Sequence, residues 1–401
     1  IAVRAEGNPL FVRELVRMLV DDGVLRADDG TWTLTVHESD IDVPPTISAL
    51  LAARIDRLRA DERTVLERAS VLGQELVRGA LVDLLPAVSH AGLDAVLDSL
   101  RRCELLEPAG TYWIDEPVLR FHHALIRDAA YRRLLKDARA DLHERAAAWL
   151  TEKTGGAAEH DEQIGFHLEQ AQANRRQLGE LDGHGRAVAA EAAHRLAAAA
   201  SRALHRDDLP AAGALAGRAL RCLDAGDPAR TDLLLIRCEA LLGTGDVADV
   251  LPAIEELAEL ASIDARLGAW ATAFTVQLAT LTGSADLDEA GEAARAAAEQ
   301  LAELGDATGA AKAHRVHASV LARLGRIAET EAALDRALTS AREADDRRQI
   351  SGVLAAAPVA ALWGPSPVPR AGGRCLDVVR LLRITPGARA VEAISTRCQA
   401  V

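Results

Sequence analysis

Apolar residues recur at helical spacing along most of the chain, and short polar or glycine-containing turns interrupt them. Near the start, five large apolar residues fall on one helix face: Leu10, Phe11, Leu15, Met18 and Leu19. The Asn-Pro pair before them is typical of a helix start, and the helix should end near residues 21–23. Residues 31–36 alternate polar and apolar positions instead, which predicts a short strand.

Residues 45–150 have the element order of a winged helix. Three short helices are predicted at about 61–73, 78–85 and 92–102, after a first helix at 47–58, and the segment 105–121 reads as a hairpin. Acidic and basic side chains are nearly equal in number in this region. A winged helix that reads DNA usually carries a basic excess, so we expect this one to pack against protein. Further helices are predicted from 123 to 174.

From about residue 185 the helices are interrupted at a regular interval. The turn markers Asp207, Gly245, Ser284, Gly325 and Gly364 are 38, 39, 41 and 39 residues apart. Helices rich in alanine and leucine flank each marker. One such hairpin cannot bury its own apolar face, so neighbouring hairpins must stack. The period predicts an α-solenoid of tetratricopeptide-like (TPR-like) helical hairpins.

The predicted fold is therefore mainly α, with a winged-helix-like domain followed by a solenoid. We assign residues 1–44 to the end of a helical lid and a linker, and 45–150 to the winged-helix-like domain. Residues 151–184 form a helical connector, and 185–401 form the repeats, the last one truncated. The chain opens at Ile1 and its one methionine lies inside a helical pattern. We therefore expect a fragment of a longer protein.

Composition limits the partners and the compartment. The net charge is -14, and an acidic chain repels phosphate backbones, so we expect no nucleic-acid binding by this segment. The five cysteines lie far apart without a CxxC pair, which suits reduced thiols in a cytoplasmic protein. No apolar run approaches the roughly 20 residues that span a bilayer, so we expect no membrane association.

The search for catalytic motifs finds none. None of the three lysines follows a glycine, so the chain lacks a P-loop, and no metalloprotease or nucleophile-elbow motif is present. We expect no catalytic residue, no metal site and no enzymatic activity in this chain alone. His314 and His317 stand three residues apart and could share a metal, but we favour a solvated or partly packed pair.

Two further segments allow an alternative to an ordinary structural role. Residues 363–369 (WGPSPVP) resemble a proline-rich ligand, but their place at a repeat junction favours a rigid turn. The acidic pairs at 207–208 and 345–346 are interpreted as helix ends in solvent.

Several short motifs occur in an order that resembles a known family. They are residues 6–15 (EGNPLFVREL), 43–58 (VPPTISALLAARIDRL), 121–131 (FHHALIRDAAY), 142–145 (LHER) and 166–171 (FHLEQA). Together with the repeats, they resemble the STAND class of regulatory ATPases over essentially the whole chain. The match is closest to actinobacterial proteins in which a class III adenylate/guanylate cyclase domain precedes an ATPase and a TPR-like tail.

The resemblance implies specific nucleotide contacts. Gly7, Asn8 and Pro9 look like the start of the helical lid, where the proline packs against the bound nucleotide; the alternative is a simple helix start. His123 stands where these ATPases often place a histidine that reaches the β-phosphate of ADP, and the alternative is a structural residue. Ala124 replaces the acidic residue that often follows this histidine, while Asp128 one turn later is retained.

The resemblance also implies a function. We expect the regulatory part of an ATP-dependent signal-transduction switch, with ATP or ADP bound only in the intact protein. The expected partners are an upstream ATPase domain in cis and a protein or small-ligand inducer on the repeats. The parent would be a purine nucleotide cyclase, producing either cyclic AMP or cyclic GMP. The alternatives are a LuxR-type transcriptional regulator and a non-enzymatic repeat scaffold.

Overall fold

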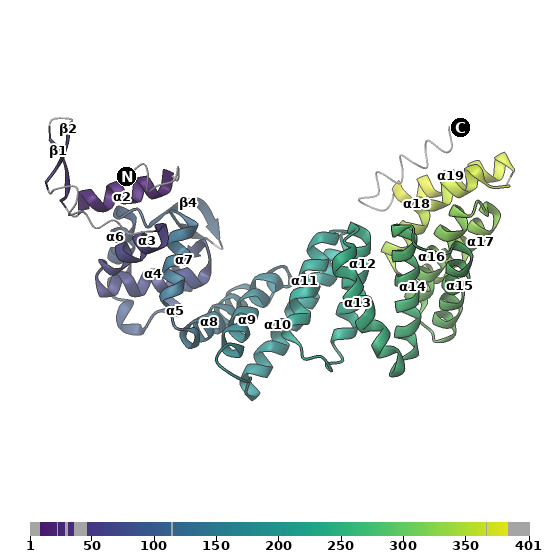
Figure 1. Ribbon diagram of the computed structural model, residues 1–401, viewed down its shortest axis with the longest axis horizontal. Helices are drawn as coiled ribbons and strands as arrows, with labels where there is room; N and C mark the ends of the chain where they lie inside the picture. Colours follow the sequence, from purple (N-terminus) through teal and green to yellow (C-terminus); the bar gives the residue numbers. More distant parts are fainter. Residues whose placement is uncertain are drawn as a thin grey trace. The chain divides into compact units, whose positions relative to one another are not determined.

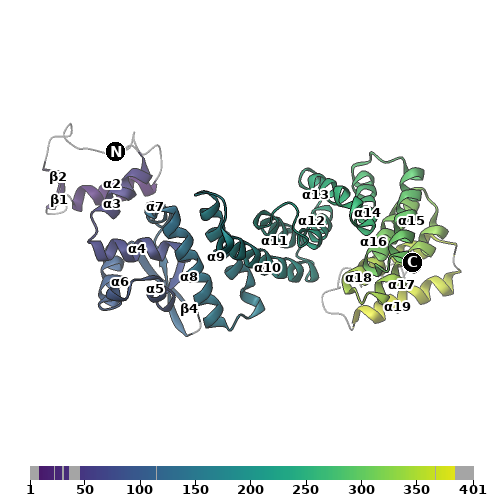
Figure 2. The same cartoon turned by 90° about the horizontal axis from the view of Figure 1, so that it is seen from below.

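The computed structural model describes residues 9–21, 23–28, 31–35, 46–113, 115–365 and 367–383. These residues are mainly helical and fall into two compact units, 1–195 and 196–401. Figure 1 and Figure 2 show the first unit in purple to blue-green and the second in teal to yellow. The mainly α fold expected from the sequence is confirmed.

The first unit begins with α2 (Pro9–Asp21), which ends where the sequence predicts. The short strand β2 (Thr31–Leu34) pairs antiparallel with β1 (Leu25–Asp28). The apolar face of α2 packs on α3 (Ile47–Asp56) through a small cluster made of Phe11, Leu15, Met18, Leu19 and Leu50. This contact joins the N-terminal helix to the rest of the unit.

A winged-helix-like domain follows. Its elements are, in order, α4 (Ala60–Leu72), β3 (Glu75–Val77), α5 (Arg78–Leu84), the 3₁₀ turn η2 (Ala87–Ser89), α6 (Leu93–Arg102), β4 (Leu106–Trp113) and β5 (Glu116–Phe121). The strands form one antiparallel sheet in the order β3-β5-β4. The predicted helices and hairpin are confirmed. The three-residue strand β3 was missed, because so short a segment has no period of its own and becomes a strand only by pairing with β5.

One continuous core holds this domain together. Leucines from α3, α4, α5 and α6 meet Phe121 of β5 and Ile126 of α7 (Ala124–Arg133). Phe121 and Ile126 are both fully buried. The unit continues with α8 (Lys136–Thr154), the turn η3 (Ala158–His160), α9 (Asp161–Arg176) and α10 (Gly183–His205), which crosses into the second unit.

The second unit is a series of helical hairpins. Its helices are α11 (Leu209–Cys222), α12 (Arg230–Thr244), α13 (Val247–Glu259), the turn η4 (Leu260–Ser262), α14 (Ala265–Thr282), α15 (Leu287–Glu303), α16 (Ala307–Arg323), α17 (Ile327–Glu343), α18 (Arg347–Trp363) and α19 (Val368–Arg383). Successive helices pack against each other, and buried alanines such as Ala294, Ala333 and Ala337 allow a close approach. The TPR-like solenoid is confirmed.

The predicted turns lie between helices, and three of the five marker residues have a left-handed backbone there. Gly245 has φ 80° and Gly325 has φ 74°, and Asp207 adopts φ 62° without being a glycine. The acidic pairs are helix ends as expected: Asp208 caps α11 and Asp346 caps α18 through their side chains. Trp363 ends α18 and Val368 begins α19, so the proline-rich segment lies at a helix junction, as predicted.

Two further findings concern membrane-spanning helices and cysteines. No helix within the described ranges is long and apolar enough to cross a membrane. Four cysteines lie in the described chain and all are free thiols: Cys103, Cys222, Cys238 and Cys375.

Candidate ligand-binding site

The residues that the sequence assigns to nucleotide contact are only partly within the described chain. Gly7 and Asn8 lie outside the described residues. Pro9 is the first residue of α2, so the alternative of a helix start is correct for it. Nucleotide contact by Pro9 stays a prediction.

His123 caps the N-terminus of α7. Its backbone is extended (φ -149°, ψ 144°), and its Nδ1 atom accepts a hydrogen bond from the backbone N–H of Leu125 at 3.1 Å. An accepting Nδ1 places the proton of the neutral ring on Nε2, which is then a free donor. The side chain is half-buried. His123 therefore has a structural role as a helix cap, and its contact with a phosphate stays a prediction.

Two other histidines form a buried pair between α8 and α9. Nδ1 of His143 lies 2.9 Å from Nδ1 of His167, and Nε2 of His143 lies 3.0 Å from the hydroxyl of Tyr131. Burial lowers the pKa of His143 to about 2, with further lowering by His167, and burial lowers the pKa of His167 to about 4. Both rings are therefore neutral at pH 7, and they fix the packing of α7, α8 and α9.

His314 and His317 are also buried, so they are packed rather than solvated. Burial lowers the pKa of His314 to about 4 and also lowers the pKa of His317. In the described parts of the chain, no group of three His, Cys, Asp or Glu residues is placed to hold a metal ion. The pair therefore lacks the third ligand that a metal site would need.

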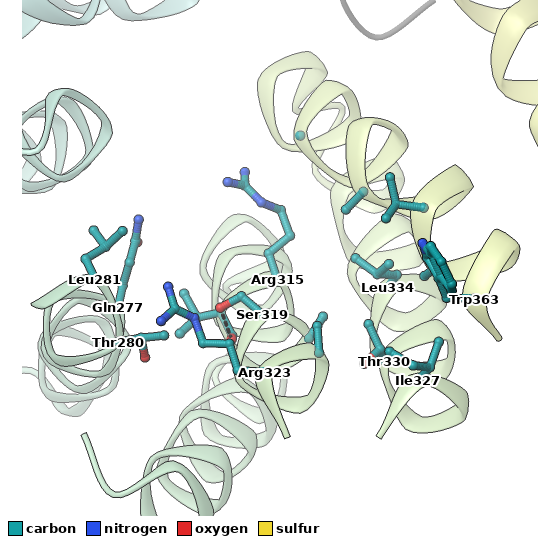
Figure 3. Close-up of a pocket in the computed structure, with 17 residues that line it drawn as sticks. Gln277, Thr280, Leu281, Arg315, Ser319, Arg323, Ile327, Thr330, Leu334 and Trp363 are labelled. Carbon is teal, nitrogen blue, oxygen red and sulfur yellow. Dashed lines mark hydrogen bonds between the residues drawn. The ribbon is translucent and has the colours of Figure 1, made fainter. Parts of the chain in front are cut away.

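The second unit contains a pocket of about 510 Å³ among α14, α16, α17 and α18. In Figure 3, Arg315, Ser319 and Arg323 project from α16, with Gln277, Thr280 and Leu281 of α14 on one side. Leu334 and Ile327 of α17 and Trp363 of α18 form the other side. A volume of this size suits a small ligand.

The pocket combines apolar side chains with one kind of charge. Trp363 is 73% exposed and Leu281 51% exposed, so large apolar surface is open to a ligand. Among the described residues that line the pocket, the charged ones are Arg315 and Arg323. The pocket is thus positive within a chain of net charge -14.

A buried ionic cluster joins α12 to two of the helices that line the pocket, α16 and α18. Glu239 of α12 accepts hydrogen bonds from Lys312 of α16 and Arg348 of α18. Lys312 and Glu239 side chains are 2% and 8% exposed. Burial raises the pKa of Glu239, but Lys312, Arg348 and Arg315 together lower it by more, so the net pKa lies below its usual value and the carboxylate stays ionised. Lys312 also lies over the ring of Phe274, 5.3 Å from its centroid.

Unlike Lys312 and Arg348, Arg315 of α16 forms no direct ion pair with a carboxylate of the described chain. Its NH1 group donates to the amide oxygen Oε1 of Gln349 at 2.6 Å. None of the carboxylates in the described ranges forms an ion pair with it. Burial lowers the pKa of the Arg315 guanidinium; Glu239 raises it and Arg348 lowers it further. The guanidinium is therefore a desolvated charge whose direct hydrogen bond is to a neutral group.

The sequence reasoning missed this pocket and the ionic cluster. Lys312 was counted only as one of three lysines. Its neighbours Ala310, Ala311 and Ala313 are all fully buried, so a lone lysine inside an alanine-rich run was the available signal. The partner Glu239 lies 73 residues away, and no local pattern connects the two.

Comparisons with known proteins leave the family open. No protein-family model matches the chain, and no curated protein matches it. Among solved structures, a signal transduction ATPase with numerous domains (STAND) and a tetratricopeptide repeat sensor, from Pyrococcus horikoshii, is similar with 13% identity, a TM-score of 0.33 and 88% of this chain covered. The similar part spans 56% of that protein.

Two further solved structures are similar over most of their length. A Rap protein complexed with competence and sporulation factor has 14% identity and a TM-score of 0.35, with 87% of this chain and 96% of that chain covered. Aspartyl phosphate phosphatase F from Bacillus subtilis has 10% identity and a TM-score of 0.38, with 90% and 95% covered. At TM-scores below 0.5, these similarities do not bear on what this chain binds or does.

Proposed function

We propose that this chain is the regulatory and sensor part of a STAND-type, ATP-dependent signal-transduction protein. The observation that carries the proposal is a positively charged, partly apolar pocket in the repeats of a chain that also holds a winged-helix-like domain. In this scheme the repeats bind an inducer, and the first unit closes over a nucleotide held by an upstream ATPase domain. A ligand shifts such a switch only by its difference in affinity for the two states.

The nucleotide side of the proposal rests on His123. Because Nδ1 is already used as an acceptor at the start of α7, Nε2 is the ring atom that would donate to a phosphate of ADP. Gly7, Asn8 and Pro9 would contact the nucleotide as well. The bound nucleotide supplies the phosphates whose hydrolysis drives the switch, and the chain's own residues hold the closed, ADP-bound state.

The proposal also includes the output activity of the parent protein. We favour a purine nucleotide cyclase upstream of the ATPase domain over a LuxR-type transcriptional regulator or a non-enzymatic repeat scaffold. The near balance of charge in the winged-helix-like domain supports a protein-facing role for it. Reading the coding sequence on both sides of this segment decides between the three: a cyclase domain with a P-loop before it, or a basic helix-turn-helix after it.

A pair of substitutions at His123 separates phosphate contact from helix capping. Serine keeps a side-chain acceptor at the N-cap, whereas alanine removes it at a cost of about 1 kcal/mol. In the intact protein, we expect both H123S and H123A to release ADP faster and to raise basal output, and only H123A to lower the melting temperature. An H123S protein with the wild-type ADP off-rate would show that His123 acts only as a cap.

A further inference from the structure

Arg315 and Arg323 project from the same helix into the pocket of the second unit. They are eight residues apart on α16, which places them about 12 Å apart along the helix axis. Both line the pocket, and no carboxylate of the described chain lines it with them. Arg323 is exposed and Arg315 is half-buried, so one charge lies at the surface and the other deeper.

The backbone of α18 is shaped to receive Arg315. A Cβ atom at Gly352 would lie 2.6 Å from NH1 and 2.8 Å from Cζ of Arg315. Glycine within a helix is destabilising relative to alanine, so its presence in the middle of α18 needs a local reason. Here the missing side chain leaves the space in which the guanidinium lies against the helix.

The neighbouring carboxylate is already engaged. Glu239 accepts from both Lys312 and Arg348, and its hydrogen bonds leave Arg315 with the amide of Gln349. Glu239, Asp346 and Asp207 attract the Arg315 guanidinium from a distance, but none of them pairs with it, and a desolvated cation without a directly paired carboxylate is unfavourable. A ligand carboxylate would supply that partner through a charge-assisted hydrogen bond.

The rest of the pocket describes the remainder of the ligand. Leu334 and Ile327 lie across from the arginines, and the exposed indole of Trp363 lies at the same side (Figure 3). A volume of about 510 Å³ is filled by a small molecule rather than by a folded partner. The charge and the apolar wall together select an amphiphilic anion.

We propose that this pocket binds a small carboxylic acid with an aliphatic or aromatic body, with its carboxylate on Arg315 and its apolar part against Trp363 and Leu334. The inference rests on the proposed function only in taking this ligand as the input that the repeats sense. Arg323, near the surface, guides the anion and adds a weaker contact.

Binding to the purified 1–401 chain tests the ligand class directly. The probes are octanoate and 1-naphthoate, each matched with its uncharged amide, in isothermal titration calorimetry. We expect saturable binding of the acids at one site per chain and at least tenfold weaker binding of the amides. R315M should weaken binding of the acids at least tenfold, and R323Q about threefold, because a buried charged hydrogen bond counts for more than an exposed one.

A glycine pair supplies a matched control. G352A should weaken the acids about as much as R315M, since the new methyl group displaces the guanidinium. G291A is the control, because a Cβ at Gly291 meets only Val320 Cγ1 at the ordinary distance of 3.6 Å. Wild-type affinity in G352A would contradict the proposed placement of the carboxylate.

The melting temperature distinguishes a binding role from a structural one. We expect R315M to match or exceed the wild type in melting temperature while losing affinity, because it removes a charge without a carboxylate partner. A destabilised R315M, equal affinity for acids and amides, or binding of an acidic peptide without binding of either acid would each overturn the proposal. None of these results affects the ADP release measured for the His123 variants, so the two proposals fail separately.

Discussion

Nδ1 of His143 and Nδ1 of His167 lie 2.9 Å apart in the interior of the first unit. One of the two atoms must donate and the other accept, so two neutral rings hold opposite protonation at these positions. Tyr131 completes the chain, with its hydroxyl 3.0 Å from Nε2 of His143. Arg139 and Arg127 stack on Tyr131, 4.5 and 4.9 Å from its ring centroid. The two guanidinium groups disfavour protonation of the nearby His143.

Acid should therefore weaken the first unit. The pKa of His167 falls to about 4 and that of His143 to about 2 in the folded chain, below the usual 6.5, so the unfolded chain binds more protons below pH 6.5. Stability is complete above pH 6.5 and is lost as the pH falls toward 4, by about 1.4 kcal/mol per pH unit for each histidine. Urea unfolding at pH 7.5, 6.0 and 5.0 measures this slope.

A double variant isolates the contribution of the pair. H143L/H167L replaces two titrating rings with apolar side chains, and His314 and His317 remain as a background that also titrates. We expect the double variant to be less stable at pH 7.5, because the Tyr131 hydroxyl loses its partner, but to have a flatter pH dependence. A slope equal to that of the wild type would show that the pair is not the origin of the acid sensitivity.

The repeat turns were predictable from sequence because the backbone constrains the residue type there. A left-handed residue after a helix favours glycine or aspartate, and Gly245, Gly283 and Asp207 occupy such positions with φ of 80°, 72° and 62°. Marker residues of this kind repeat with the period of the hairpin. Helix positions followed in the same way from apolar spacing, since each helix buries one face.

The pocket was not predictable because it depends on how distant repeats stack. Glu239 and Arg348 are 109 residues apart and lie on helices that each look like ordinary repeat helices. Which residues meet is decided by the small rotation between successive hairpins, and no single helix encodes it. His123 illustrates the converse limit: its capping bond to Leu125 follows from local geometry, but the proposed contact with a phosphate would depend on residues outside this chain.

Neutralising Glu239 should destabilise the second unit strongly. E239Q leaves Lys312 buried without a counter-charge and leaves Arg348 with only the exposed Asp207, 3.6 Å away; breaking a buried ion pair in this way costs about 3–5 kcal/mol. Burial already lowers the pKa of Lys312 to about 8 despite the attraction of Glu239. Chemical unfolding followed by circular dichroism gives the change in free energy of unfolding.

Two comparisons make the Glu239 result interpretable. E239M/K312M removes both buried charges, so it should recover much of the loss seen in E239Q. Glu299 pairs with Arg295 on the surface, with side chains 56% and 43% exposed, so E299Q should change stability by less than about 0.5 kcal/mol. Similar losses in E239Q and E299Q would contradict a role for burial.

Asp306 accepts two hydrogen bonds and also lies 3.5 Å from a guanidinium nitrogen of the partly exposed Arg266. Its Oδ1 accepts from the backbone N–H of Gly309 at the start of α16, and its Oδ2 accepts from Nε1 of Trp270 at 2.8 Å. D306A should cost about 2 kcal/mol, from a lost cap and an unpartnered indole N–H. D286A is the control, because Asp286 caps α15 through backbone bonds alone and should cost about 1 kcal/mol. Thermal unfolding measures the loss of stability in both variants. Equal losses in D306A and D286A would show that the hydrogen bond to Trp270 contributes nothing.

The contact of α2 with α3 contains one buried ion pair beside the apolar cluster. Arg54 of α3 donates to the carboxylate of Glu14, whose side chain is 1% exposed, and to the backbone carbonyl of Cys103. R54M leaves Glu14 buried with only the half-exposed Arg13, 3.5 Å away, as a partner, so α2 should detach more often while the winged-helix-like core stays folded. Hydrogen exchange read by mass spectrometry should show at least tenfold faster exchange in residues 12–19 and no change in α4 or α6.

R17Q is the control, since Arg17 pairs with an exposed Glu104 and should leave α2 protected. Unchanged exchange in R54M would mean that the apolar cluster around Leu15 is enough to hold α2 in place. Arg54 would then not control the detachment of α2.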